Sequence, residues 1–344
     1  MPFLFWRKKK ISCNKTNDQK IIKSVRIKIP AKLMISGEHS VIYNSKAVTC
    51  AVNIFLNIEI KKITKSVIII NDGKDCRKVY LKDLSIEHKN SDVILEIIRR
   101  FFDKAKLPLC GMKITIKNSI PIGCGLGSSS SLVAGIVFGI NELFGGKKSV
   151  SELINAATSI ENIFHGKSSG VDIQTVVKGG VLYVNHNSVN KIAHQIDEIW
   201  IVNTGCPSFS TKNVVMNVFD NFASHDELWR EMGEITSDIA EIMLSKEKVF
   251  KKIAHNESCL EKIGVVKPNV KKFIDNLKSN DIYGKVCGAG TIARREKNGG
   301  NGIIGIFQKL SKEQEKYLFS MCKKNKFSVK KIYISNAGLI ISSK

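Results

Sequence analysis

Residues 120–131 read I-P-I-G-C-G-L-G-S-S-S-S, with three glycines on alternate positions followed by four serines. Glycine lets a backbone approach a bound phosphate closely, and the free N–H groups at the start of a helix attract negative charge. A serine hydroxyl in that first turn can bind the magnesium that accompanies a nucleotide triphosphate. The stretch is therefore a candidate phosphate loop. A plain strand-to-helix turn with serine caps is the alternative.

Two common glycine loops are excluded by spacing. A dinucleotide fingerprint requires G-x-G-x-x-G, whereas Gly123, Gly125 and Gly127 form G-x-G-x-G. A Walker loop requires G-x-x-x-x-G-K-[ST], and the stretch contains no lysine. Any phosphate chemistry here must take its positive charge from another part of the chain.

A second candidate is E-N-I-F-H-G-K-S-S-G-V-D, residues 161–172. On a helix that begins near residue 149, Glu161 is the only charged member of an otherwise apolar stripe. A carboxylate that faces a core needs a cation or hydrogen-bond donors, so we expect Glu161 to pair with a lysine or hold a metal. Asp172 follows a loop of small residues that can approach a ligand; a loop or cap residue is the alternative for it.

Two further stretches complete the set. In I-P-A-K-L-M-I-S-G-E-H-S-V-I-Y, residues 29–43, three ionisable groups stand among apolar and small residues: Lys32, Glu38 and His39. They indicate a polar pocket, with surface exposure as the alternative. K-V-C-G-A-G-T, residues 285–291, is a second glycine turn in the other half of the chain.

The elements that position these residues are strands mixed with helices in both halves. Alternating or β-rich runs predict strands at 24–30, 51–60, 67–70, 113–117, 181–185, 198–203, 303–307 and 331–335. Helical spacing predicts helices at 91–104, at 132–144 and from 149 to about 165, where Ser149 and Glu152 have capping-box spacing, and several between 211 and 280. We expect two α+β domains with a boundary near residue 190, after a tail formed by residues 1–20.

Composition favours an ordinary globular protein, with 43% hydrophobic and 25% charged residues and no apolar run long enough to span a membrane. The net charge of +23 raises the possibility of a nucleic-acid partner. The excess is nearly all lysine, whereas basic sites are usually enriched in arginine, so we expect no nucleic-acid partner. Nine scattered cysteines without a C-x-x-C pair predict free thiols and a reducing, cytoplasmic location.

Taken together, the motifs resemble those of the GHMP kinases. The resemblance is carried by P-A-K-L-M-I-S-G-E-H (30–39), P-I-G-C-G-L-G-S-S-S (121–130) and K-V-C-G-A-G (285–290), and it extends from about residue 25 to the C-terminus. Within the family it is closest to the branch whose members phosphorylate mevalonate, because E-x-x-x-H-G-x-x-S-G-x-D ends in Asp172 and P-S-F-S-T-K (207–212) looks like that branch's threonine motif.

The resemblance implies an α+β, two-domain GHMP kinase fold, with a ribosomal protein S5 domain 2-like domain at 21–190 and a ferredoxin-like domain at 191–344. It implies that Asp172 accepts the proton of the substrate hydroxyl, aided by Lys32, and that Ser129 and Glu161 hold Mg²⁺. The residues implied to cradle ATP are Gly123, Gly125, Leu126, Gly127, Ser128 and Ser129, with Gly288, Ala289 and Gly290 closing from the second domain. Those implied to face mevalonate are Lys32, Glu38, His39, Asp172 and Thr211.

Some alternatives stay open at this stage. After G-A-G the chain continues T-I-A-R-R-E-K-N-G-G-N-G, where the resembling kinases commonly continue in glycines, so loop 291–302 is expected to be rebuilt. The acceptor could instead be phosphomevalonate or a sugar. The alternative from another class is a non-catalytic RNA-binding protein. A homodimer is compatible with the sequence and is not required by it.

Overall fold

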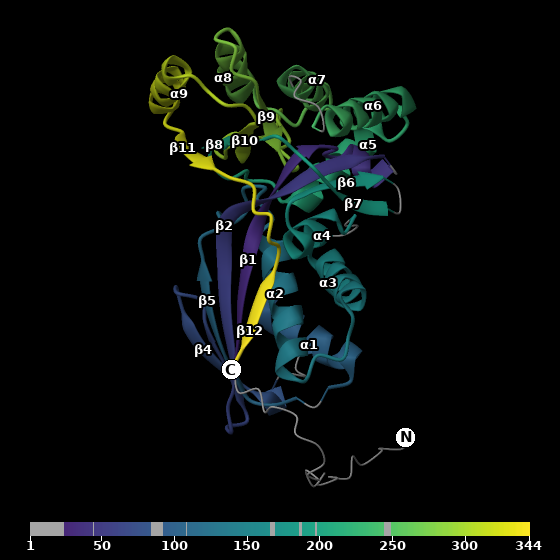
Figure 1. Cartoon of the computed structure of the whole chain (residues 1–344), viewed down its shortest axis with the longest axis vertical. Helices are drawn as coiled ribbons and strands as arrows, with labels where there is room; N and C mark the ends of the chain where they lie inside the picture. Colours follow the sequence, from purple (N-terminus) through teal and green to yellow (C-terminus); the bar gives the residue numbers. More distant parts are fainter. Residues whose placement is uncertain are drawn as a thin grey trace.

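The molecule contains two β-sheets with helices packed against them (Figure 1). The computed structural model describes residues 24–43, 45–83, 92–107, 109–165, 169–185, 188–196, 198–243 and 249–344. The expected tail at residues 1–20 lies outside these ranges. The mixture of sheets and helices confirms the α+β class.

The first sheet is built on two long antiparallel strands, β1 (Ser24–Ser36) and β2 (Ala47–Lys62). Its strand order is β12-β1-β2-β5-β3-β4, and β6 pairs both with β2 and with β7. The remaining strands are β3 (Val67–Asn71), β4 (Cys76–Tyr80), β5 (Met112–Asn118), β6 (Val181–Asn185), β7 (Ser188–Ile192) and β12 (Ile340–Ser343). Because β12 pairs with β1, the C-terminal end of the chain completes this sheet.

Burial along β1 changes from one end to the other. Buried and exposed residues alternate up to Ile29, as in a strand with one solvated face, and from Pro30 onward every residue is buried. This second part of β1 contacts helices α6 (Asp226–Ile242) and α7 (Val249–Lys262) and strand β9 (Gly284–Cys287) from the other half of the chain. The strand therefore carries Lys32 into the boundary between the two halves.

Four helices lie beside the first sheet: α1 (Val93–Ala105), α2 (Ser128–Leu143), α3 (Val150–His165) and α4 (Val171–Lys178). Helices α2 and α4 contact its strands, and α1 and α3 pack against α2. Helix α2 crosses β1 and β2 closely. A Cβ atom on Gly139 would lie 2.7 Å from the Cδ1 atom of Ile27 and 2.9 Å from that of Ile60, so any larger residue would displace these side chains. The close crossing holds the start of α2 beside β1.

The second sheet is antiparallel, in the order β11-β8-β10-β9. Its strands are β8 (Ile199–Asn203), β9, β10 (Ile303–Ile306) and β11 (Ser328–Ile332), and the other helices of this half are α5 (Thr211–Phe222), α8 (Pro268–Lys278) and α9 (Lys312–Asn325). Buried apolar residues of both sheets join one continuous cluster. The two halves are thus packed together through their cores.

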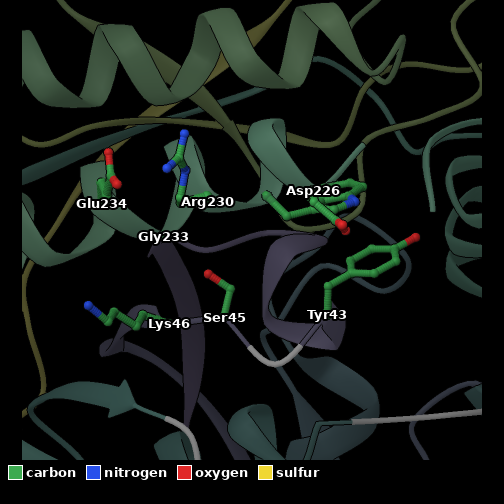
Figure 2. Close-up of a pocket in the computed structure, with 8 residues that line it drawn as sticks. Tyr43, Ser45, Lys46, Asp226, Arg230, Gly233 and Glu234 are labelled. Carbon is green, nitrogen blue, oxygen red and sulfur yellow. The ribbon is translucent and has the colours of Figure 1, made fainter. Parts of the chain in front are cut away.

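Helix α6 lies against the short 3-10 helix η1 (Ser40–Tyr43) of the first half, and a cavity of about 560 Å³ opens between them (Figure 2). Figure 2 shows Tyr43 and Lys46 on one side, with Arg230 and Glu234 from α6 on the other. Two hydrogen bonds close the boundary beside it, from Lys46 Nζ to Ser237 Oγ at 2.6 Å and between the hydroxyls of Ser36 and Thr236 at 2.7 Å. None of the residues predicted for the site lines this cavity.

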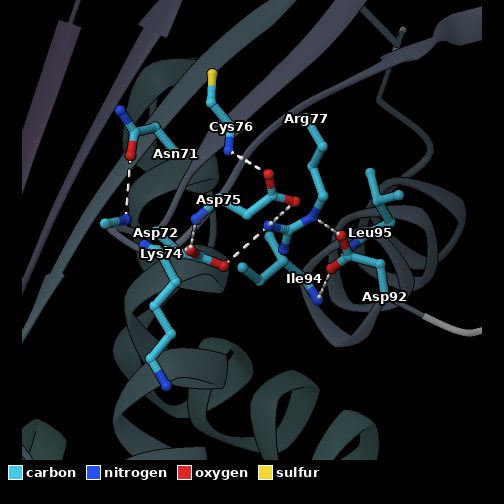
Figure 3. Close-up of polar contacts among 10 residues, drawn as sticks. Asn71, Asp72, Lys74, Asp75, Cys76, Arg77, Asp92, Ile94 and Leu95 are labelled. Carbon is cyan, nitrogen blue, oxygen red and sulfur yellow. Dashed lines mark hydrogen bonds and ion pairs between the residues drawn. The ribbon is translucent and has the colours of Figure 1, made fainter.

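Arg77 joins the β3–β4 hairpin to the start of α1 (Figure 3). Its guanidinium contacts Asp92 and also lies 2.9 Å from Asp72 Oδ2. Asp92 is the N-cap of α1 and accepts a hydrogen bond from the Ile94 backbone N–H at 2.9 Å. The hydrogen bond from Arg77 lowers the pKa of Asp72 to about 2. This network stabilises the outer edge of the first sheet.

Most predicted elements are present, with boundaries that differ by a few residues. The capping box is confirmed, since the Ser149 N–H donates to Glu152 Oε2 at 2.8 Å and the Glu152 N–H to Ser149 Oγ at 3.3 Å. The structure adds β4, β7, β9, β12 and α4, which the sequence did not predict. In the described part of the chain, no helix has the length and apolar character to cross a membrane. The expected boundary near residue 190 stays a prediction.

Candidate active site

The predicted phosphate loop connects β5 to α2, as expected. Gly123, Gly125 and Gly127 all have positive φ, which L side chains rarely adopt. A Cβ on Gly125 would lie 2.6 Å from the carbonyl oxygen of Cys287 in the second half, so the backbones of the two glycine turns touch. Gly127 is the N-cap of α2 and has no side chain to cap the helix. The first backbone N–H groups of α2 are therefore available to bind an anion.

Lys32 lies against this loop. Its backbone N–H donates to the Leu126 carbonyl at 3.0 Å, and a Cβ on Gly127 would lie 3.2 Å from the Lys32 Cβ. Its Nζ atom lies 2.9 Å from Asp172 Oδ2. Burial alone would lower the pKa of Lys32, but the charge and hydrogen bond of Asp172, with a smaller contribution from Glu38, raise the pKa, so the lysine stays charged. The cation that the loop lacks therefore comes from β1.

Asp172 occupies the first turn of α4, two residues after the N-cap Gly170. Its side chain is about one third exposed, whereas that of Lys32 is buried. The aspartate thus sits where the buried boundary opens to solvent, with one carboxylate oxygen held by Lys32. A hydroxyl group that reached this point would meet a proton acceptor and a cation together.

Glu161 is buried, with 3% of its surface exposed, and confirms the prediction that it faces the core. Its Oε1 atom accepts a hydrogen bond from the Ser130 hydroxyl in the first turn of α2. The Ser131 hydroxyl donates to the Pro30 carbonyl at 3.0 Å. The serine turn therefore joins α3 to β1, and the carboxylate lies directly behind the glycine loop.

Glu38 forms an ion pair with Lys285, and the side chains are 1% and 0% exposed, respectively. Burial alone would lower the pKa of Lys285, but the charge and the hydrogen bond of Glu38, together with smaller contributions from neighbouring groups, raise it. Lys285 begins the second glycine motif, but no role was predicted for it from the sequence. Its position directly before an apolar stretch and a glycine turn was the signal that it could be buried, and a buried lysine requires an acidic partner.

His39 is buried beside this pair, and its Nε2–H donates to the Ala289 carbonyl at 3.0 Å. Burial lowers the pKa of His39, so the ring is neutral at pH 7. A Cβ on Gly288 would lie 3.1 Å from the Cα of Gly125. Lys32, Glu38 and His39 are all buried, so surface exposure, the alternative for this motif, is wrong.

A further carboxylate, missed from the sequence, lies next to Lys285. Glu257 on α7 is buried, and its Oε2 atom accepts the Val286 backbone N–H at 2.8 Å. Burial raises the pKa of Glu257 to about 8. It therefore carries a proton at neutral pH and adds no second negative charge to the pair.

The remaining predicted residues have fewer contacts with the groups described above. Thr211 begins α5 and is exposed, and no hydrogen bond or ion pair among the described residues joins it to Asp172 or His39. Ser128 and Ser129 are half-buried in the first turn of α2. Gly290 has a φ of 66°, and a Cβ there would lie 2.5 Å from the Val265 carbonyl oxygen, so this position requires glycine.

Loop 291–302 has a structure of its own, as the altered sequence predicted. Glu296 is buried and accepts hydrogen bonds from the Ser208 N–H at 2.8 Å and the Gly299 N–H at 2.7 Å. These donors outweigh desolvation and lower the pKa of Glu296 to about 2. Arg294 and Arg295 are exposed to solvent.

The prediction that all cysteines are free thiols is wrong for one pair. Cys124 in the glycine loop is bonded to Cys206 in the other half, 82 residues away. Six other described cysteines are free, at positions 50, 76, 110, 259, 287 and 322; Cys13 lies outside the described residues. No short spacing motif marks the pair, because only the packing of the two halves brings its members together.

Comparison with known proteins agrees with this geometry. The description "GHMP kinases N terminal domain" matches residues 92–180. The chain is 26% identical to the mevalonate kinase of Archaeoglobus fulgidus, over 81% of this chain and 91% of that protein. It is 26% identical to the mevalonate kinase of Methanocaldococcus jannaschii, over 84% and 93%. A crystal structure of the Methanococcus jannaschii mevalonate kinase superposes with a TM-score of 0.75 at 23% identity, over 90% of this chain and 98% of that one.

Residues 92–180 thus match the N-terminal domain of the GHMP kinases, and the two sheets form the same two-domain fold as the superposed kinase structure. The relatives reported above are mevalonate kinases.

We predict that Lys285→Met destabilises the protein by about 3–5 kcal/mol, because it leaves the Glu38 carboxylate buried without a cation. The double variant Glu38→Gln/Lys285→Met should recover much of this loss. The measurement is urea unfolding of the three proteins. Lys271→Met is the control, because its ion pair with Glu261 is solvent-exposed and should contribute less than about 1 kcal/mol. Equal losses at Lys285 and Lys271 would contradict the assignment.

Proposed function

We propose that this chain is a mevalonate kinase, which transfers the γ-phosphoryl group of ATP to the 5-hydroxyl of mevalonate in isoprenoid biosynthesis. The observation that carries the kinase chemistry is the Lys32–Asp172 pair beside Gly127, at the open edge of the buried boundary. The choice of acceptor is supported by the sequence relatives, which are named mevalonate kinases and align over about four fifths of the chain.

In this proposal Asp172 accepts the proton of the mevalonate hydroxyl while that oxygen attacks the γ-phosphorus of ATP and ADP leaves. Lys32 polarises the hydroxyl and offsets the negative charge that gathers around the transferring group. The contact between Lys32 and Gly127 holds the lysine beside the loop, so Lys32 and Asp172 lie next to the place where the nucleotide binds. Positioning and charge neutralisation then supply most of the catalysis.

The nucleotide phosphates bind the backbone amides of the loop, from Gly123 to Ser129, at the uncapped start of α2. Gly288, Ala289 and Gly290 face the same loop from the second half, and Gly288 is close enough to touch Gly125. ATP therefore lies where the two halves meet.

Residues present in the structure fit a magnesium ion at this point. Glu161 supplies a buried carboxylate directly behind the first turn of α2, where the Ser129 hydroxyl provides a second oxygen donor. Bound there, Mg²⁺ would offset the negative charge of the nucleotide phosphates. A cation would also suit a carboxylate on an otherwise apolar helix face.

On the acceptor side, we propose that Glu38, His39 and Thr211 face mevalonate together with Asp172. Glu38 acts mainly through its pair with Lys285, which holds the G-E-H turn in place. His39 is neutral and tied to Ala289, so it adds shape and polarity without charge. We further propose that the halves 21–190 and 191–344 behave as the two domains of the enzyme.

A panel of acceptors tests the function. The purified protein with ATP and Mg²⁺ is expected to turn over mevalonate faster than phosphomevalonate, galactose or homoserine, measured by coupled ADP release. Turnover of another acceptor with none on mevalonate would replace the acceptor while keeping the kinase class. Steeply salt-dependent RNA binding without any ATP turnover would instead favour the RNA-binding alternative.

Asp172→Asn is expected to lower kcat by roughly 10² to 10⁴, because the amide cannot accept the hydroxyl proton. The Kd of a fluorescent ATP analogue should stay nearly unchanged. Asp220→Asn, at an exposed position on α5, is the matched control and should keep full activity. An unaffected kcat in Asp172→Asn would remove this residue as the base.

Glu161→Gln keeps the shape of the side chain and removes its charge. We expect the Mg²⁺ concentration for half-maximal turnover to rise by roughly tenfold or more. Glu241→Gln, on the exposed face of α6, is the control. An unchanged Mg²⁺ requirement in a correctly folded Glu161→Gln protein would count against the ligand role.

A further inference from the structure

The glycine loop is linked covalently to the second half of the molecule through Cys124 and Cys206. Their Cα atoms are 4.9 Å apart, a separation that suits a disulfide, and the bond joins residues 82 positions apart in sequence. Cys124 stands between Gly123 and Gly125, in the middle of the phosphate loop. The nucleotide machinery assigned above uses neither thiol.

Cys206 is fixed to the second half by a ladder of backbone hydrogen bonds with loop 291–302. The Gly300 N–H donates to the Cys206 carbonyl and the Gly302 N–H to the Gly205 carbonyl, both at 2.9 Å, while the Thr204 N–H donates to the Gly302 carbonyl at 3.0 Å. The segment that carries Cys206 therefore moves with β8 and β10. The rebuilt loop, where this chain departs from the family pattern, is what holds it.

Cys124 is enclosed from the same side. Its side chain is 2% exposed, and a Cβ on Gly302 would lie 2.9 Å from its carbonyl oxygen. On the other flank, Gly125 touches Cys287 and Gly288. Because the backbones of the two glycine turns are in contact, a nucleotide can enter between them only if the loop moves away from the second half. A disulfide at Cys124 opposes that movement.

We propose that Cys124 and Cys206 form a reversible thiol modification site whose co-substrate is a low-molecular-weight disulfide of the glutathione type. Cys206 is exposed, so its thiolate attacks the small disulfide, forms a mixed disulfide and releases one small thiol. The Cys124 thiolate then attacks the Cys206 sulfur and releases the second. The protein pair is oxidised by two electrons, the small disulfide is reduced to two thiols, and these thiols keep the two protons.

The bonded form holds the phosphate loop against the second half and hinders nucleotide entry and release. The reduced form leaves the loop free to move. The effects on nucleotide entry and on catalysis rest on the proposed kinase function, whereas formation of the bond does not.

The full-length protein is treated with glutathione disulfide or with dithiothreitol and digested without reduction. Mass spectrometry is expected to find the peptides containing Cys124 and Cys206 linked after oxidation and separate after reduction. Absence of the linked peptide after oxidation would overturn the site. Cys206→Ser should give no link, and Cys76→Ser, which removes an exposed thiol on β4, should link normally.

Two functional readouts follow on the same samples. The association rate of a fluorescent ATP analogue and the turnover of mevalonate should both fall by about tenfold in the oxidised protein and recover with dithiothreitol. Cys206→Ser should match the reduced protein under both conditions. A linked protein that binds the analogue at the rate of the reduced form would overturn the proposed effect on nucleotide entry. Slowed association without mevalonate turnover in either form would support the site and count against the proposed acceptor alone.

Discussion

The buried ion pair between Glu38 and Lys285 determines how the two halves of the molecule meet. Each side chain is nearly inaccessible, so neither charge can be satisfied by water, and separating the pair would leave an isolated ion in the core. The pair therefore fixes β9 against the G-E-H turn. The glycine turn that follows β9 then carries the Ala289 carbonyl to His39 and places Gly288 beside Gly125. The contact between the two glycine turns follows from one electrostatic constraint.

Three carboxylates near this boundary differ in exposure and in hydrogen-bond partner, and these differences determine what each of them can do. Asp172 is partly exposed with Lys32 on one oxygen, which leaves it able to meet a hydroxyl group. Glu161 is buried behind the helix that follows the phosphate loop, where it accepts the Ser130 hydroxyl and a substrate hydroxyl cannot reach it. Glu38 is committed to a lysine. Burial and partner, rather than residue type, thus decide which carboxylate can act as a base.

Local patterns in the sequence predicted local features well. The capping box of Ser149 and the burial of Glu161 depend on residues within one helix, so helical spacing was sufficient to find them. Lys285 and Cys206 were missed because their partners lie 247 and 82 residues away, and no periodicity connects such positions. The strand β12 was missed for the same reason, since its pairing with β1 joins the two ends of the chain. Sequence patterns therefore predicted individual residues of the site, whereas the contacts between distant residues became visible only in the packed structure.

The charge balance of the boundary explains why so many ionisable groups can be buried together. Glu38, Glu257 and Lys285 would carry a net negative charge if all were ionised. Burial raises the pKa of Glu257 to about 8, so near neutral pH this carboxyl keeps its proton and the cluster is one cation and one anion. The Val286 N–H satisfies one of its oxygens. A neutral Glu257 fills the space beside Lys285 without competing for it, which leaves the full charge of the lysine to hold Glu38.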